Sequence, residues 1–195
     1  MYGGEPASRI VTESEYFAAF VDLAPLVAGH LLIVPRTNVP SFAAMPPEAW
    51  PDWERLRERL MLALAERWTS PAILEHGSTH QMEGGACITH AHLHVVPLDG
   101  DILAEMREDG LSFQRVADQR DVIAEKERPY LYYERAEEAW FTWADDRQIP
   151  RQYIRRVVSR MLGQTADAWD WGVVVQRELL RQTVRELRPL LDAHV

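Results

Sequence analysis

The chain has 195 residues, which is enough for one domain, or one domain with a substantial extension, around a sizeable core. Hydrophobic residues make up 47% of the chain and charged residues 26%, a composition that excludes collagen-like and largely disordered proteins. The formal charge of -9 argues against a sequence-independent grip on nucleic acid, but it leaves open a single nucleotide held by local N–H groups and one or two cations.

The N-terminal third reads as a series of short strands. Residues 9–11 and 16–21 are β-rich runs separated by a polar turn, and residues 29–35 form a further run that ends at a proline. Consecutive runs with such short connections are typical of a meander. We therefore expect the chain to begin with adjacent strands of one sheet.

A long amphipathic helix is predicted after this meander. From residue 46 to residue 68, Trp and Leu side chains recur near helical spacing while Glu and Arg occupy the opposite face. Pro71 ends the helical pattern, residues 72–75 are a candidate strand, and residues 76–85 form a loop rich in Gly, His and Ser. A second strand is expected from about Ile88 to Pro97.

The composition changes beyond Gly100, where a charged segment begins. We interpret residues 1–100 as the core and residues 101–195 as a C-terminal extension that packs on it. Hydrophobic periodicity predicts that this extension is mostly helical. Its expected elements are a hairpin of residues 130–133 and 139–143 and two amphipathic helices of about residues 151–162 and 173–191.

Cysteine content and the N-terminal residues favour a cytoplasmic protein. Cys87 is the single cysteine, so the chain carries no intramolecular disulfide and no sign of an oxidising compartment. No stretch approaches about 18 consecutive apolar residues, and residues 1–9 lack the basic-then-apolar pattern of a signal peptide. We therefore expect neither a spanning nor an exported chain, and no membrane partner.

The strongest chemical signal is a set of three histidines at alternate positions, His90, His92 and His94. Because side chains alternate faces along a strand, these imidazoles are expected to share one face, with Ala91 and Leu93 on the other. Any polar residue would satisfy a solvated face, so packing alone does not explain three histidines. The pattern leaves two chemical interpretations open: a zinc site, or nucleophilic catalysis by an imidazole.

The run HAHLHVV at residues 90–96 resembles the signature of the histidine triad superfamily, which is His-φ-His-φ-His-φ-φ with φ apolar. Upstream, FVDLAPLVAGHLLIVP at residues 20–35 is similar to the family's meander and contributes a fourth histidine, His30. The long helix and the Gly-rich turn before the triad also fall in the family's order. The resemblance covers about residues 9–98, roughly half of the chain.

This resemblance implies an α+β core with a five-stranded antiparallel sheet and a long helix, often completed as a homodimer. It implies nucleotidyl hydrolysis or transfer on a nucleoside phosphate, of phosphoramidate or dinucleoside polyphosphate type. His92 would attack the α-phosphorus and form a covalent intermediate. His90 would orient His92, while His94 and His30 would donate to the phosphate oxygens. No metal or other cofactor is required.

The resemblance also implies a set of substrate-binding residues. Asp22 stands where the family places an acceptor for the ribose hydroxyls, although a turn-forming role is the alternative. Phe20 and Leu23 would flank the base, or belong to the core. Cys87 stands where relatives often have a hydroxyl near the leaving group, and simple burial of its thiol is the alternative.

Two features upstream of the triad depart from the family's pattern. Hydrolases of one branch carry an amide near Glu75, and a carboxylate beside a phosphate would repel it unless it were protonated or turned away. The loop before the triad is several residues longer than its counterpart and adds His76 and His80. For these two histidines we favour a solvated position.

Two groups in the extension have more than one interpretation. Arg151, Arg155 and Arg156 could contact a second phosphate, yet we favour the solvated face that arginine usually occupies on an amphipathic helix. The tryptophans could stack on a base, although packing in the core of a small subdomain is favoured. These tryptophans are Trp140, Trp143, Trp169 and Trp171.

Two rival functions remain beside the nucleotidyl enzyme. One is a metal-dependent hydrolase in which His90, His92 and His94 bind zinc together with a water molecule. The other is a nucleotide-binding regulator with little turnover. Metal analysis distinguishes the first rival, and a turnover assay distinguishes the second.

Overall fold

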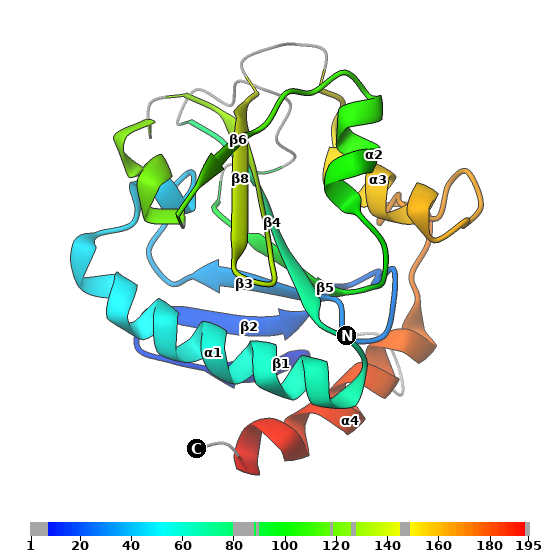
Figure 1. The fold of residues 1–195 in the computed structure, drawn as a ribbon. Helices are drawn as coiled ribbons and strands as arrows, with labels where there is room; N and C mark the ends of the chain where they lie inside the picture. The colour runs from blue at the N-terminus through cyan, green and yellow to red at the C-terminus, as the bar shows by residue number, and fades with distance from the viewer. Residues whose placement is uncertain are drawn as a thin grey trace.

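The computed structural model describes residues 8–79, 88, 90–117, 119–125, 128–144 and 149–193. Its strands form one eight-stranded sheet in the order β1-β2-β3-β5-β4-β7-β8-β6, in which neighbours run antiparallel (Figure 1). The strands are β1 (Ile10–Glu13), β2 (Phe17–Val21), β3 (Leu31–Pro35), β4 (Pro71–Gly77), β5 (Leu93–Pro97), β6 (Gln114–Val116), β7 (Tyr130–Arg135) and β8 (Glu138–Trp143). The helices are α1 (Trp50–Arg67), α2 (Ile102–Glu108), α3 (Tyr153–Met161) and α4 (Arg177–Ala193).

The N-terminal meander is confirmed. Along β2 and β3, buried and half-buried residues alternate, as they do when one face of a strand packs on a core. The buried residues Phe17, Leu31 and Ile33 point toward the same side of the sheet. This alternation explains why the sequence pattern was sufficient to locate these strands.

Helix α1 covers this side of the sheet, as its amphipathic pattern predicts (Figure 1). Its buried stripe includes Trp53, Leu56, Leu60 and Leu64, which recur at the spacing of one helical face. Helix α4 packs against α1 and β1, so the end of the chain completes the same layer.

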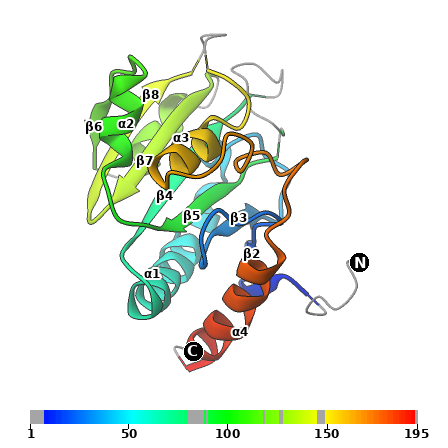
Figure 2. The ribbon, with the colours of Figure 1, turned by 90° about the vertical axis from the view of Figure 1, so that its right-hand side faces the viewer.

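Helices α2 and α3 pack on the opposite side of the sheet (Figure 2). Leu74, Val96 and Tyr133 from three strands meet Val157 and Val158 of α3 in a second buried cluster. The sheet is therefore enclosed between two helical layers, which is an α+β arrangement. The side under α3 is the one that bears the candidate site.

The sheet is larger than expected, with eight strands rather than five. The expected hairpin is present as β7 and β8, and β7 pairs with β4 along the edge that would otherwise end the sheet. The polypeptide turns between these strands at Ala136 and Glu137, which have φ angles of 50° and 67°. The division into a core of residues 1–100 and an extension of residues 101–195 stays a prediction.

The structure corrects the start of the second predicted strand. Strand β5 begins at Leu93 rather than near Ile88, so His90 and His92 precede it. The reason is that the N–H of Ala91 donates to the carbonyl of Val39, in the loop after β3, at 2.7 Å. Among the described residues, no helix has the length and apolar content needed to cross a membrane.

Candidate active site

The candidate site lies where β5 begins, on the side of the sheet that faces α3. In the sheet, His94 is paired with Leu32 of β3 and Leu74 of β4. A cavity of about 180 Å³ opens beside it. Its lining includes His92, His94, Phe20, Leu23 and Asp22, and residues of α3 and the segment after it close the other side. The structure thus brings most of the sequence-predicted residues to one cavity.

The imidazole of His92 lines the cavity, and a backbone carbonyl holds one of its two ring nitrogens. Its Nδ1 lies 3.0 Å from the carbonyl oxygen of His90. A carbonyl can only accept, so Nδ1 carries the proton, and in the neutral ring Nε2 keeps its lone pair. Burial lowers the pKa of His92, which favours that neutral ring. The lone pair that neutral His92 can offer to a ligand is therefore on Nε2.

His90 contacts His92 through its backbone carbonyl. Its own Nε2 lies 2.8 Å from the carbonyl oxygen of Pro35 and donates to it. His90 does not line the cavity, whereas its carbonyl oxygen fixes the tautomer of His92. The side chain of His90 binds the end of β3, and the backbone of the same residue orients His92.

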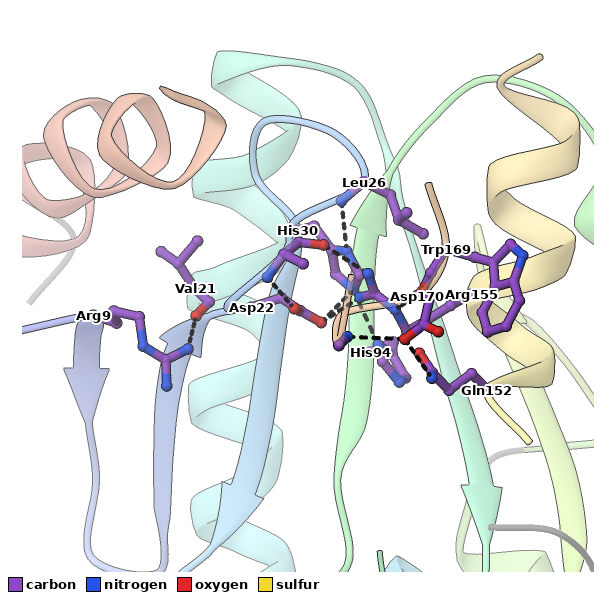
Figure 3. Close-up of polar contacts among 12 residues, drawn as sticks. Arg9, Val21, Asp22, Leu26, His30, His94, Gln152, Arg155, Trp169 and Asp170 are labelled. Carbon is purple, nitrogen blue, oxygen red and sulfur yellow. Dashed lines mark hydrogen bonds and ion pairs between the residues drawn. The ribbon is translucent and has the colours of Figure 1, made fainter. Parts of the chain in front are cut away.

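A second pair of histidines is fixed in the same way (Figure 3). The N–H of Leu26 donates to Nδ1 of His30 at 3.2 Å, so the proton of neutral His30 is on Nε2. That Nε2–H lies 3.0 Å from Nδ1 of His94 and donates to it. The proton of His94 is consequently on Nε2, across the ring from His30, where it can donate to a ligand.

Burial keeps both of these histidines neutral. It lowers the pKa of His30 to about 4, with Arg155 adding to the effect and Asp22 opposing it. Burial also brings the pKa of His94 well below its usual value, and the neighbouring His30 and His92 contribute. His30 lies behind His94 and does not line the cavity, so its predicted direct contact with a phosphate oxygen stays a prediction.

Asp22 is buried and bonded through both of its carboxylate oxygens. Oδ1 accepts the N–H of Ala24 at 2.8 Å, and Oδ2 accepts from Nη1 of Arg155 at 2.8 Å. Burial raises the pKa of Asp22, but His30, Arg155 and the Ala24 N–H outweigh that effect and leave it below the usual value. The Ala24 contact is that of a turn-forming aspartate, while the ribose role of Asp22 stays a prediction.

The favoured interpretation of Arg155 is wrong. Its side chain is only 4% exposed, not solvated. Besides Asp22, it donates from Nη2 to the carbonyl of Ala24 at 2.7 Å and from Nε to the carbonyl of Trp169 at 2.7 Å (Figure 3). The physical reason is that the buried Asp22 carboxylate needs a cation, which periodicity along one helix does not reveal.

The favoured interpretations of Trp171 and of His76 are also wrong. Trp171 is 47% exposed and lines the cavity, and Trp169 is half-buried beneath the guanidinium of Arg156. Trp140 and Trp143 are half-buried and pack against the two buried clusters, which agrees with the favoured packing role. His76 belongs to β4 instead of a solvated loop, and it too lines the cavity.

Two predicted residues cannot be placed, and one is turned away. Cys87 and His80 lie outside the described residues. Glu75 is paired with Leu93 and faces α1, on the other side of the sheet from the cavity. It accepts from the N–H of Phe42 at 2.7 Å and from the hydroxyl of Tyr130 at 2.5 Å. Of the two options for Glu75, protonated or turned away from the phosphate, the structure shows that it is turned away.

The zinc alternative requires His90, His92 and His94 as ligands, but the structure brings a different set of potential metal ligands together. Within the described part of the chain, one group of potential metal ligands has its atoms within 4.8 Å of one another, namely Asp22, His30 and His94. The guanidinium of Arg155 already binds Asp22, which places a positive charge beside that group. His90 and His92 each direct one ring nitrogen to a carbonyl instead.

A second, larger cavity of about 820 Å³ lies along α3. Arg156, Trp169 and Trp143 are among its lining residues, but none of the histidines is. Since the groups able to attack or protonate a phosphate line the smaller cavity, that one is the candidate active site.

Comparisons with known proteins agree with the motif. A family model of the HIT domain matches residues 4–101. An uncharacterized HIT-like protein of Mycobacterium tuberculosis is 34% identical over 106 residues, which cover 52% of this chain and 70% of that protein. An asymmetrical bis(5'-nucleosyl)-tetraphosphatase of Schizosaccharomyces pombe is 26% identical over 90 residues, covering 46% of this chain and 49% of that protein.

Among solved structures, a hypothetical histidine triad nucleotide-binding protein of Sulfolobus tokodaii is 21% identical, with a TM-score of 0.40. That match covers 49% of this chain and 64% of the other. Across these three relatives, the chain therefore spans between 49% and 70% of their own length.

Proposed function

Since the chain belongs to the HIT family, we propose that it hydrolyses or transfers the nucleotidyl group of a nucleoside phosphate through a covalent intermediate on His92. The observation that carries this proposal is the contact between His92 Nδ1 and the carbonyl of His90. It leaves the lone pair of Nε2 available at a cavity that also presents the proton-bearing nitrogen of His94.

The proposed reaction has two displacements. The lone pair of His92 Nε2 attacks the α-phosphorus, a P–N bond forms, and the bond from phosphorus to the leaving group breaks. The Nε2–H of His94 donates to a non-bridging oxygen and stabilises the charge that develops there. Water or another acceptor then attacks the same phosphorus, losing its proton to solvent, and His92 departs as a neutral imidazole.

We favour dinucleoside polyphosphates over phosphoramidates as the substrate class. The relative from Schizosaccharomyces pombe is named for cleaving a bis(5'-nucleosyl) tetraphosphate. Phe20, Leu23 and Leu32 supply apolar surface in the cavity, which suits a nucleobase next to the phosphate-binding histidines. A homodimer and a cytoplasmic location stay predictions.

A turnover assay tests this proposal against both rivals. Purified protein is given a panel of dinucleoside polyphosphates and nucleoside phosphoramidates, with and without a chelator. The proposal expects turnover that a chelator does not change, because an imidazole rather than a metal-bound hydroxide attacks. Loss of activity on chelation, restored by stoichiometric zinc, supports the metal-dependent rival. Tight nucleotide binding without turnover supports the regulator.

The pH profile of the same assay provides a second test. Burial lowers the pKa of His92, so its neutral form persists below pH 6.5, the usual value for histidine. The acid limb of kcat/KM is therefore expected to fall below pH 6.5. An acid limb above that value would mean that the nucleophile is not this buried histidine.

A further inference from the structure

The C-terminal residues hold the loop between β2 and β3 at several points. Arg155 of α3 binds both the carboxylate of Asp22 and the carbonyl of Ala24. Gln164 donates from Nε2 to the carbonyl of Leu26 at 2.7 Å. The position of this loop is therefore set by residues far from it in the sequence and outside the matched HIT domain.

This loop in turn sets the protonation of the histidines. Its Leu26 N–H donates to Nδ1 of His30, and that contact requires Nδ1 to be unprotonated. His30 then donates from Nε2 to Nδ1 of His94. A protonated His30 would carry a hydrogen on Nδ1 as well, so two donors would face each other and the bond to Leu26 would be lost.

Asp22 acts against this arrangement. Its Oδ2 lies 3.7 Å from Nε2 of His30, and a carboxylate at that distance favours the protonated imidazole. Arg155 contacts the same Oδ2 at 2.8 Å and offsets its charge. Arg9 also acts electrostatically on Asp22, and the remaining charged or titratable neighbours of His94 are His92 and His76.

We infer that Arg155 is a positioning residue of the active site: by pairing with Asp22 and holding Ala24, it fixes the loop whose Leu26 N–H keeps His30 in the tautomer that donates to His94, and it lowers the pH at which that arrangement is lost. The inference deepens the proposed function, because His94 then has its proton on the nitrogen that can face the substrate. Arg155 itself acts through Asp22 and His30. A purely structural arginine would tie the elements together without influencing the protonation of either ring.

NMR of the ¹⁵N-histidine-labelled protein tests this inference without any substrate. In the wild type at pH 7, we expect His30 and His94 to be neutral, each with an unprotonated Nδ1 and a protonated Nε2. In Arg155→Met, we expect His30 to bind protons about tenfold more tightly, since the charge opposing Asp22 is gone. The amide of Leu26 should then lose its protection against exchange, relative to the intrinsic rate, at a higher pH than in the wild type.

Two further variants separate charge from structure. The double variant Asp22→Asn/Arg155→Met removes both charges of the buried pair, so His30 should remain neutral as in the wild type. Arg151→Met removes an exposed arginine just before α3 and should leave both rings unchanged. The double variant also provides a folded protein if Arg155→Met alone does not fold, because it leaves no unpaired buried charge.

Several results would overturn the inference. A proton on Nδ1 of His30 in the wild type at pH 7 would do so without any variant. The inference would also fail if His30 titrated in Arg155→Met as it does in the wild type. It would fail as well if the proton affinity of His30 rose as much in the double variant as in Arg155→Met. None of these readings depends on turnover, so a failure of the proposed reaction would leave them interpretable, and their failure would leave the chemistry of His92 untouched.

Discussion

Asp22 and Glu75 are two buried carboxylates on opposite sides of one sheet, and their surroundings make them titrate differently. Asp22 faces the guanidinium of Arg155, and its pKa is lowered despite burial. Among the described residues, the partners of Glu75 are neutral donors, and burial raises its pKa to about 7. The charges of His30 and Arg155 beside Asp22 outweigh the effect of burial on its pKa, whereas three neutral hydrogen bonds at Glu75 do not.

The two sides of the sheet therefore respond to pH with opposite signs. His30 has a folded pKa of about 4, below its unfolded value of 6.5, so its contribution to stability is lost as the pH falls through that interval. Glu75 has a folded pKa of about 7, above its unfolded value of 4.5, so stability is lost as the pH rises between them. Between about pH 4.5 and 6.5 these effects oppose each other.

The largest expected effect comes from His92, on the side of the sheet that bears the candidate site. His92→Asn removes the nucleophile, and we expect kcat/KM to fall by about a thousandfold or more. The side chain of His92 donates to the His90 carbonyl, and the amide of asparagine can also donate to a carbonyl. The variant should therefore remain folded and bind nucleotide. Steady-state kinetics and a thermal melt measure both properties. Normal turnover would remove the proposed mechanism.

The next effect concerns the buried ion pair. Asp22→Ala leaves the charge of Arg155 buried without its partner, and we expect a loss of about 3 to 5 kcal/mol in the free energy of unfolding. The matched control is Asp22→Ala/Arg155→Met, which should recover much of that loss. Urea denaturation measures all three proteins. Equal stability of the single variant and the wild type would mean that the pair contributes nothing to the fold.

The same variant tests the predicted contact with ribose. If Asp22 accepts a bond from a ribose hydroxyl, the wild type should bind ribonucleotides about ten- to a hundredfold more tightly than 2′-deoxy analogues, and Asp22→Ala should lose that preference. The affinity ratio is measured where both proteins are folded. A ratio that the substitution leaves unchanged would assign Asp22 to the loop and to Arg155 alone.

Glu75→Gln sharpens the contrast between the two sides by removing one of the opposing titrations. The wild type should lose about 3 kcal/mol from Glu75 between pH 4.5 and 7, and the variant should not. The stability of the variant should instead rise through this range, as expected for the buried histidines alone. Denaturant titrations at several pH values measure the difference, and parallel curves for both proteins would contradict it. Turnover is expected to be unaffected, since Glu75 faces away from the cavity.

The smallest expected effect is at the β7–β8 turn, away from both carboxylates. Ala136 and Glu137 have positive φ angles, which favour Asn and Gly in a two-residue hairpin loop. Ala136→Asn/Glu137→Gly should stabilise the protein by about 1 kcal/mol without changing turnover. A destabilised double variant would show that these side chains contribute contacts that outweigh the backbone strain.

The sequence predicted those parts of the molecule that depend on local pattern. Runs rich in β-forming residues located β2 and β3, and the motif of His90, His92 and His94 indicated the family that the comparisons confirm. The partner of Asp22 could not be found in this way, because Arg155 lies 133 positions away and reaches it only when α3 docks on the sheet. One signal was present: an acidic residue inside an apolar run needs a buried cation.

The start of β5 was misplaced for a similar reason. Alternation continues through residues 88–92, but the backbone N–H of Ala91 is taken by Val39 in a loop. A pattern of side chains does not reveal which backbone group accepts a given N–H. The same contact places His90 and His92 outside the strand, where a carbonyl rather than the alternation of a strand fixes the ring of His92.

The most direct test of the central claim is to isolate the intermediate on His92. Wild-type protein is mixed with excess substrate, quenched during turnover under alkaline denaturing conditions, and digested for peptide mass spectrometry. The claim predicts one added nucleotidyl group on the peptide that contains His92, located on that residue and missing from His92→Asn. A nucleotidyl group on any other residue, or turnover in which no protein-bound nucleotide forms at any time, would contradict it.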